Sequence, residues 1–246
     1  MGAKKSSPHG YWKYAFTLPI VGTLLLGLNK PSTAWAQHGA PAATARASSA
    51  TPACRALLSA VKAKDPAEVA ALLKTATPDC AYEGDGEPRS PLVAAARQGN
   101  VAIGQLLVGA GAAVGFHAAG DETPLMAAAA NGHLVFVKFL VGRGAETNTQ
   151  VPGDGNALLV AAREGHANIV RYLIAHGADA NGQVASDGTP LICSVRNGHY
   201  EVAKVLLDAG ADPSLASGGD EDPVFYARES KDQAMQKLLQ QYQKRP

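Results

Sequence analysis

Histidines and aspartates recur along the chain at one fixed interval, and both residue types can hold metals or move protons. Three histidines lie 33 residues apart, at His133, His166 and His199. Four aspartates follow the same interval, at Asp121, Asp154, Asp187 and Asp220. Imidazoles and carboxylates are common zinc ligands, and together they can also form a general base with its orienting group. Whether these side chains can meet depends on the elements that carry them.

The same interval governs residues that shape the backbone, which marks an internal repeat. One series of glycines falls at Gly99, Gly132, Gly165 and Gly198. A second series falls at Gly111, Gly144, Gly177 and Gly210. A proline position recurs at Pro91, Pro124, Ala157, Pro190 and Pro223, with alanine once in its place. A period of this length is typical of solenoids, in which each unit is one supersecondary element stacked on its neighbours.

One unit can be interpreted from its local chemistry. Thr123 can cap a helix whose first turn holds Pro124, where a missing N–H costs nothing. Asn131-Gly132 ends that helix with a turn. A second helix follows, with an apolar stripe at Phe136, Val137, Leu140 and Val141. Helices this short are unstable alone, so successive units must stack and bury their stripes. The polar remainder of the unit is expected to form an extended loop or hairpin.

These residues resemble the ankyrin repeat. The resemblance rests on Thr123-Pro124-Leu125, Gly132-His133 and Gly144-Ala145, and on the matching Thr189-Pro190-Leu191, Gly198-His199 and Gly210-Ala211-Asp212. It implies an all-α solenoid of helix–turn–helix units with projecting loops. Met126, Leu159 and Ile192 stand where the family usually has histidine, so that side chain's hydrogen bond to the turn should be missing.

The resemblance covers residues 54–246 and implies about six units. Their expected bounds are about 54–84, 85–117, 118–150, 151–183, 184–216 and 217–246. The terminal units are irregular, as capping units are expected to be. The loop Val151–Asn156 is similar to loops of ankyrin arrays in bacterial exported and membrane-sensor proteins, including arrays fused to peptidase-type β-lactam antirepressors. The chain contains no His-Glu-x-x-His motif of such a peptidase.

The N-terminus has the layout of a secretory signal peptide over residues 1–36. A basic region is followed by an apolar run at 15–28 and by Ala34-Trp35-Ala36, which predicts cleavage after Ala36. The alternative is an uncleaved membrane anchor. Residues 37–53 are predicted to be a flexible linker. Export would place the protein in the periplasm or outside the cell. Residues 1–36 hold four of the 22 basic residues and none of the 21 acidic ones. The remainder is therefore mildly acidic, which gives no case for nucleic acid.

The repeat argues against catalysis. Packed helices lie about 8–10 Å apart, whereas each metal ligand lies about 2 Å from its ion, so equivalent histidines of successive units cannot share a metal. We predict that the histidines bond to neighbouring backbone and the aspartates to loop backbone. We expect no enzymatic activity, cofactor or metal site.

The cysteines have separate roles in this interpretation. Cys54 and Cys80 should lie at the same end of the first unit, which in an exported protein predicts a disulfide; the alternative is two free thiols. Cys193 is predicted to be a small buried residue. Its alternative is a nucleophile assisted by His199.

Function then rests on positions that the repeat leaves free. At the ends of the first helices these are Arg97, Gln98, Asn131, Arg163, Glu164, Arg196 and Asn197. At the loop tips they are Phe116, His117, Gln150 and Gln183. We predict that the chain is a monomeric, exported protein-interaction module that binds a protein partner on the concave face and loop tips; for each residue the alternative is a solvated surface. The alternative functions are an envelope sensor related to the antirepressor arrays and an immunity protein to a secreted toxin.

Overall fold

The computed structural model describes residues 51–83, 88–118, 121–184, 187–217 and 221–243. The predicted signal peptide, residues 37–50 of the predicted linker, and Asp220 lie outside the described residues. All the described residues belong to one compact unit. Within these ranges, no helix combines the length and the apolarity that crossing a bilayer requires.

The described chain forms six consecutive pairs of helices. The pairs are α1 (Pro52–Lys62) with α2 (Pro66–Leu72), α3 (Pro91–Arg97) with α4 (Val101–Gly109), α5 (Pro124–Ala130) with α6 (Leu134–Gly142), α7 (Ala157–Arg163) with α8 (Ala167–Ala175), α9 (Pro190–Arg196) with α10 (Tyr200–Asp208), and α11 (Pro223–Glu229) with α12 (Gln233–Gln243). This order confirms the helical solenoid that the sequence predicts.

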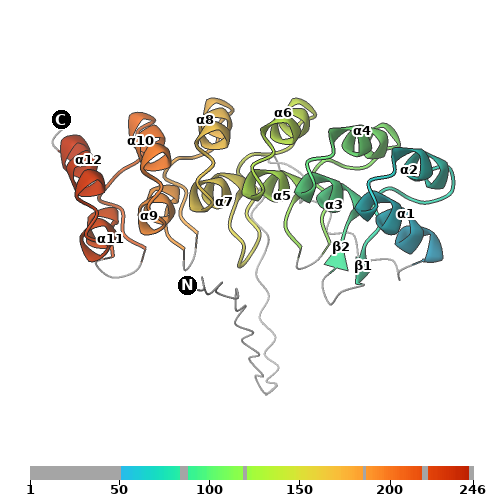
Figure 1. The fold of residues 1–246 in the computed structure, drawn as a ribbon, viewed down its shortest axis with the longest axis horizontal. Coiled ribbons are helices and arrows are strands. Elements are labelled where there is room, and N and C mark those ends of the chain that lie inside the picture. Colours follow the sequence, from blue (N-terminus) through green and yellow to red (C-terminus); the bar gives the residue numbers. More distant parts are fainter. Residues whose placement is uncertain (1–50, 84–87, 119–120, 185–186, 218–220, 244–246) are drawn as a thin grey trace, which may run out of the picture. The chain divides into compact units, whose positions relative to one another are not determined.

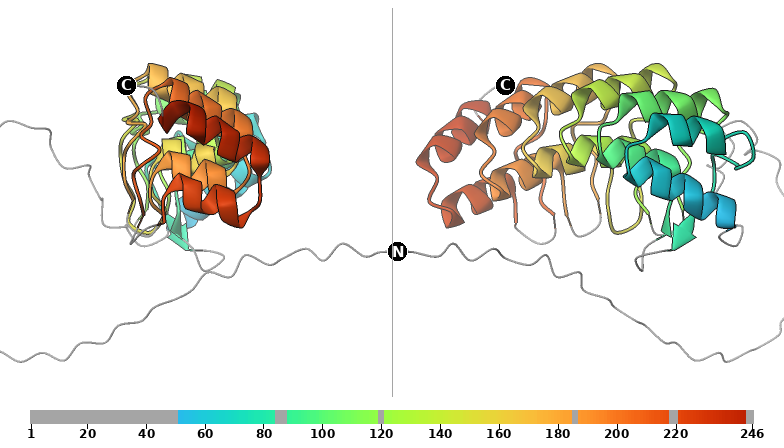
Figure 2. Two further views of the ribbon diagram at one scale, coloured as in Figure 1. Left: turned by 90° about the vertical axis from the view of Figure 1, so that its left-hand side faces the viewer. Right: turned by 45° about the vertical axis from the view of Figure 1, so that its right-hand side comes forward.

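The helices stack in two rows (Figure 1). The odd-numbered helices form the first-helix row, in which each packs on the next from α1 to α11. The even-numbered helices form the second-helix row, from α2 to α12. The loops project from the side of the first-helix row that faces away from the second (Figures 1 and 2). Among the described helices, the main packing contacts between units join sequence neighbours, as expected of a repeat array.

The first helices begin as their cap residues predict. The Thr123 hydroxyl accepts a hydrogen bond from the Met126 N–H at 3.2 Å, and Pro124 occupies the first turn of α5. Thr189 caps α9 in the same way. Asn156 caps α7, which has alanine where the other first helices have proline. The caps satisfy backbone donors that the first turn leaves without partners.

The core lies between the two rows and within the first-helix row. Because first helices are packed on several sides, their alanines disappear from the surface; Ala127, Ala128 and Ala129 are each fully buried. The second helices bury one stripe, such as Phe136, Val137 and Leu140 in α6. The residues that replace the family's histidine, Met126, Leu159 and Ile192, are also buried. Apolar packing therefore takes the place of the missing polar contact.

The turn glycines Gly99, Gly132 and Gly165 each lie against the histidine of the next unit. Gly132 has a φ of +76°, and a Cβ built there would lie 2.8 Å from Cε1 of His166. Gly144 has a similar φ of +87°, but a Cβ there would meet nothing within 4 Å. The first glycine position therefore carries a backbone and a packing requirement, and the second carries only the backbone requirement.

This difference gives a matched pair of variants. Gly144→Ala should lower the free energy of unfolding by about 1 kcal/mol, the cost of a left-handed alanine. Gly132→Ala should cost about 1–2 kcal/mol more, since the His166 ring must also move. Chemical denaturation of both variants measures the difference. Equal losses would mean that the histidine contact imposes no packing constraint.

The loops form short antiparallel pairings. β1 (Tyr82–Glu83) pairs with β2 (Pro88–Arg89), and isolated bridges join Val151 to Gly155 and Val184 to Gly188. These match the predicted hairpins. Helix α1 begins at Pro52, two residues before the expected start of the repeat region, because Thr51 caps it and Pro52 fits its first turn.

The final pair of helices closes the array as predicted. Lys231 takes the left-handed turn conformation, with a φ of +57°, in place of the usual glycine. Helix α12 spans Gln233–Gln243 and buries Met235, Leu238 and Leu239. The hydroxyl of Tyr242 donates a hydrogen bond to Asp208 of α10, which ties this helix to the preceding unit.

Candidate functional site

The three recurrent histidines each join two units through a backbone hydrogen bond. Nε2 of His133 donates to the Arg97 carbonyl at 3.0 Å, that of His166 to Ala130 at 3.1 Å, and that of His199 to Arg163 at 2.9 Å. Each acceptor lies 36 residues earlier, near the end of the preceding first helix. The prediction of turn histidines bonded to neighbouring backbone is confirmed.

The aspartates do more than bond to loop backbone. Oδ1 of Asp121 accepts from the Glu122 N–H at 3.1 Å, as predicted, but it also lies 3.3 Å from Nη2 of Arg97. Nε of Arg97 donates to Glu122 as well. This cluster joins the end of α3 to the loop before α5. Asp121 is only 3 % exposed, and its Oδ2 has no hydrogen-bond partner in the described structure.

Burial controls the charge of Asp121. Removal from water raises the pKa of this carboxyl from 3.8 to about 6; the Arg97 cation opposes that rise, and the neighbouring Glu122 carboxylate adds to it. At neutral pH the site therefore holds a carboxylate that the protein solvates poorly.

Asp121 should give the array a measurable pH dependence. Because the folded state holds this proton more tightly than the unfolded chain, the carboxyl's stabilising contribution is complete below pH about 4 and is lost as the pH rises through about 6. In the unmodified chain the free energy of unfolding should fall by an amount on the order of 1 kcal/mol across this range, and Asp121→Asn should abolish that fall. Urea unfolding at a series of pH values measures it.

The matched control is Asp187→Asn, at the same place two units later. Its side chain is 23 % exposed against 2 % for that of Asp121, so the substitution controls for the loss of a carboxylate at this register position. Parallel profiles for the unmodified chain and Asp121→Asn would contradict the prediction.

The three arginines predicted at the ends of the first helices make contacts within the array. Arg97 is held by two carboxylates, as described above. Nη2 of Arg196 lies 3.5 Å from Oδ1 of Asp187, and its guanidinium lies 5.9 Å from the centre of the Tyr226 ring. Nε of Arg163 lies 3.2 Å from Oε1 of the adjacent Glu164. Arg163 and Arg196 each keep 36 % of the side chain exposed, so both still reach solvent.

Two residues predicted at a loop tip lie inside the fold. Phe116 is 8 % exposed, because a large apolar side chain in a loop gains free energy by packing on the array. Its carbonyl accepts from the Ser90 hydroxyl at 3.5 Å. His117 is half-buried, and its Nδ1 bonds to the Asp121 carbonyl at 3.0 Å. Phe116 is therefore not available as an exposed anchor.

The predicted amides lie at the surface but bond to the array. Asn131 and Asn197 are exposed and donate at 2.8 Å to the carbonyls of Ala127 and Cys193 in their own helices. Gln150 and Gln183 are exposed loop residues, and the Gln150 side chain donates to the Gln183 carbonyl at 3.3 Å. Gln98 is half-buried and donates to Lys62 at the end of α1.

The two predicted arginines that still reach solvent lie at the ends of α7 and α9. These two helices pack together, and they bring Arg163, Glu164, Arg196 and Asn197 to adjacent units. We call these four residues the first-helix patch.

Comparison with known proteins decides the family. A family model described as "Ankyrin repeats (3 copies)" matches residues 57–151 and 137–217, well over half of the chain. The chain is a member of the ankyrin-repeat family. Among solved structures, the human ASB11 ankyrin repeat domain has a TM-score of 0.68 at 22 % identity, covering 77 % of this chain and 83 % of that one. That likeness concerns the fold alone. No curated protein matches the chain.

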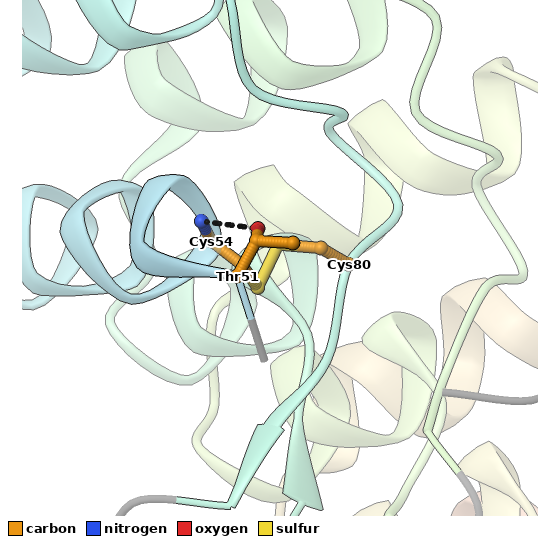
Figure 3. The surroundings of a disulfide bond; sticks show 3 residues. All are labelled: Thr51, Cys54 and Cys80. Carbon is orange, nitrogen blue, oxygen red and sulfur yellow. Dashed lines mark hydrogen bonds between the residues drawn. A yellow bond between two sulfur atoms is a disulfide. The ribbon is translucent and has the colours of Figure 1, made fainter. Parts of the chain in front are cut away.

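The first unit of the ankyrin array contains the expected disulfide. Cys54, near the start of α1, is bonded to Cys80, which lies after α2 (Figure 3). The two Cα atoms are 5.9 Å apart, and both residues are buried. The bond ties the start of the unit to the chain that leads into the next one.

Cys193 is buried in α9, as predicted for a small core residue. Burial raises the pKa of its thiol to about 11, which disfavours the nucleophilic thiolate. Its Sγ lies 3.5 Å from the Asp187 carbonyl, and the Nε2 of His199 is bonded to Arg163 instead. The geometry therefore favours packing over nucleophilic chemistry. In the described ranges, no three His, Cys, Asp or Glu side chains cluster as metal ligands would.

Sequence reasoning missed the second-helix row as a surface. A shallow groove of about 480 Å³ lies between α8 and α10, bounded by Arg171, Ile174, Tyr200, Glu201, Lys204 and Asp208 among others. Val135 of α6 is 69 % exposed. The sequence itself indicates this surface, because Val135 occupies a register position at which other units have the polar Asn168 and Glu201. An apolar residue at a solvent-facing register position can reveal such a surface.

Proposed function

We propose that this ankyrin array is an exported protein-interaction module that binds its partner through the first-helix patch and the adjacent loops. The observation that carries the proposal is the pairing of α7 with α9, which presents two partly exposed guanidinium groups side by side on rigid helices. Arginines held in place lose little side-chain entropy on binding, and they are common energetic centres of interfaces.

Several features support this role over catalysis. The recurrent polar groups are used to hold units together, and Cys193 is a poorly ionised buried thiol. Ankyrin arrays generally mediate protein–protein contacts, and their stacked units give a stable, extended surface for doing so. A protein is therefore the expected partner.

Two observations support export. The N-terminal residues have the layout of a signal peptide, and the first unit carries a disulfide, a bond that persists mainly in oxidising compartments. Expression of the full chain in a Gram-negative host tests this. We expect N-terminal sequencing of the periplasmic fraction to begin at Gln37. Retention of the whole chain in the membrane fraction would favour the uncleaved anchor.

The binding role is tested with a photo-crosslinking residue at Asn197. We expect this position to capture one protein from an envelope extract, and we then expect Arg163→Ala with Arg196→Ala to weaken its binding at least tenfold. The array tolerates alanine at this register position, since Ala130 occupies it in the third unit. The same residue placed at Lys204, on the second-helix row, is the control. Undiminished binding by the double variant would overturn the proposed surface.

A further inference from the structure

The second-helix row is unusually apolar over α4 and α6. Each of these nine-residue helices contains one polar or charged side chain, Gln105 in α4 and Lys138 in α6. Their remaining surface is formed by alanine and glycine and by half-buried valine, leucine and phenylalanine. Val135 is the most exposed large apolar residue in the described ranges. Burying Val135 against a partner would remove apolar surface from water, which favours binding.

The neighbouring helices show that the fold does not require this composition. At the register position of Val135, α8 has Asn168 and α10 has Glu201, and both are exposed. At the position of Lys138, α4 has Gln105. The apolar character is thus a property of α4 and α6 and not of the repeat.

The cations beside this apolar surface have no acidic partner. The Lys138 ammonium lies 5.7 Å from the centre of the Tyr172 ring of α8, and the Arg143 guanidinium lies 5.4 Å from that of Phe139. Arg171 of α8 donates to Asn168. Among the described residues none of these three cations forms an ion pair, and α4, α6 and α8 contain no aspartate or glutamate.

The carboxylates of neighbouring elements lie outside the surface, and one of them, Glu201 of α10, borders the groove that Arg171 also lines. Glu146, in the turn after α6, accepts from the Thr149 hydroxyl at 3.4 Å. Asp208 of α10 pairs with Lys204 at 2.7 Å. We name Val135, Lys138, Phe139, Arg143, Arg171 and Tyr172 the second-helix patch. It combines an apolar centre with three cations, two of which are held against aromatic rings.

We propose that the second-helix patch docks an acidic amphipathic helix of a partner protein, at a surface distinct from the first-helix patch. Apolar side chains of that helix would cover Val135 and Phe139, and its carboxylates would pair with Lys138, Arg143 and Arg171. Because α4, α6 and α8 contain no acidic residue, the patch has a positive potential, which favours a negatively charged partner.

The architecture favours a helical occupant. Second helices satisfy their own backbone hydrogen bonds, so this surface offers no open strand edge to which an extended peptide could add. A helix arrives with its backbone already satisfied, and it needs only side-chain contacts. A helix covering α4 to α8 would also avoid Glu201 and Asp208 of α10.

Two other occupants fit less well. An anionic bilayer laid across the second-helix row would also meet the carboxylates of α10. It would find little to insert, because Val135 is the single strongly exposed large apolar side chain on the outer surfaces of α4, α6 and α8. A second copy placed patch to patch would bring the same cations together, and like charges in contact oppose association.

The test uses two synthetic helical peptides of about 15 residues. Both carry leucines at i, i+3, i+4, i+7 and i+11; one has glutamates at the flanking positions and the other has lysines. Fluorescence anisotropy with the disulfide-bonded array measures their affinity. We expect the glutamate peptide to bind with a Kd on the order of 10 µM, and the lysine peptide at least tenfold more weakly.

The array itself supplies substitutions that preserve the fold. Val135→Asn, Lys138→Gln and Arg143→Ala place at each position the residue that another unit has there, namely Asn168, Gln105 and Ala110. We expect this triple variant to retain its helical circular dichroism and to bind the glutamate peptide at least tenfold more weakly. Lys74→Ala, at an exposed lysine of the first unit outside both patches, should leave the affinity unchanged.

Several results would overturn the proposal. They are the absence of binding by the glutamate peptide, equal affinities for the two peptides, and full affinity in the triple variant. Sedimentation of the array with phosphatidylglycerol vesicles, lost in the triple variant, would assign the patch to a membrane instead. Concentration-dependent dimerisation lost in the triple variant would assign it to a second copy. None of these results bears on crosslinking at Asn197.

Discussion

Removing the Cys54–Cys80 disulfide should lower the free energy of unfolding of the first unit by about 3 kcal/mol. The bond closes a loop with a sequence separation of 26 residues, and a crosslink of that span restricts the unfolded chain substantially. Cys54→Ala with Cys80→Ala is the suitable variant, since both side chains are buried and serine would add an unsatisfied hydroxyl.

The loss should be local because each unit of the array contacts only its neighbours. Hydrogen exchange should show faster opening of α1 and α2, with smaller changes from α5 onward. A reductant should reproduce the effect in the unmodified chain and change nothing in the double variant. Cys193→Ala is the matched control; alanine occupies this register position at Ala94 and Ala127, so only a small loss is expected. Equal exchange in oxidised and reduced chains would contradict a stabilising role for the bond.

The repeat explains why so much of the fold could be predicted. Each unit gives an independent observation of the same local chemistry, so a cap such as Thr123 and a turn such as Gly132-His133 are seen several times at one register. Helix positions, buried stripes and the hydrogen bonds of the histidines all depend on contacts that repeat. Such features follow from spacing and local propensity, which the sequence displays directly.

The engaged arginines could not be predicted in the same way. Arg97 pairs with Asp121 of the following unit, whereas Arg196 pairs with Asp187 of its own unit. The register is the same, but the position after the aspartate is Glu122 in one unit and Gly188 in the other. A long guanidinium side chain takes whichever carboxylates surround it, and that choice depends on non-repeating residues in three dimensions.

The loop and surface errors have a related cause. The register predicts that Phe116 lies at a loop tip, because the other units have Thr149 and Gly182 there. Its size and apolarity draw it into the core instead. Conversely, Val135 has an apolar side chain at a register position that the fold leaves in solvent. Departures from the repeat were thus the informative residues for both burial and binding.

Replacing Phe136 with alanine should cost about 3–5 kcal/mol, because it leaves a large cavity in the middle of the array. Phe136 is fully buried and is the largest such side chain in the described ranges. Its ring fills space that Gly104 leaves open in the preceding unit: a Cβ on Gly104 would lie 2.7 Å from Cζ of Phe136. A glycine inside α4 lowers helix propensity by about 1 kcal/mol, so the close approach must compensate for it.

The side chains at the positions of Gly104 and Phe136 vary in size together along the array. Where the third unit has Phe136 opposite Gly104, the corresponding pairs along the array are Val137 with Ile169, Val170 with Val202, and Ala203 with Met235. The smallest residues, glycine and alanine, face the largest ones, phenylalanine and methionine, whereas valine faces isoleucine or valine. Gly104→Val and Phe136→Ile together would therefore install the pair that the next interface already contains.

A double-mutant cycle tests this complementarity. Gly104→Val alone should lower the free energy of unfolding by about 3 kcal/mol, since the Phe136 ring must leave its place, and Phe136→Ile alone should lower it by about 1–2 kcal/mol through the cavity it leaves. The double variant should recover most of the loss, with a coupling energy of about 2 kcal/mol measured by urea denaturation. If the losses of unfolding free energy in the two single variants simply add in the double variant, the two side chains are not energetically coupled. The array's stability at this interface would then depend on total apolar burial and not on matched shapes.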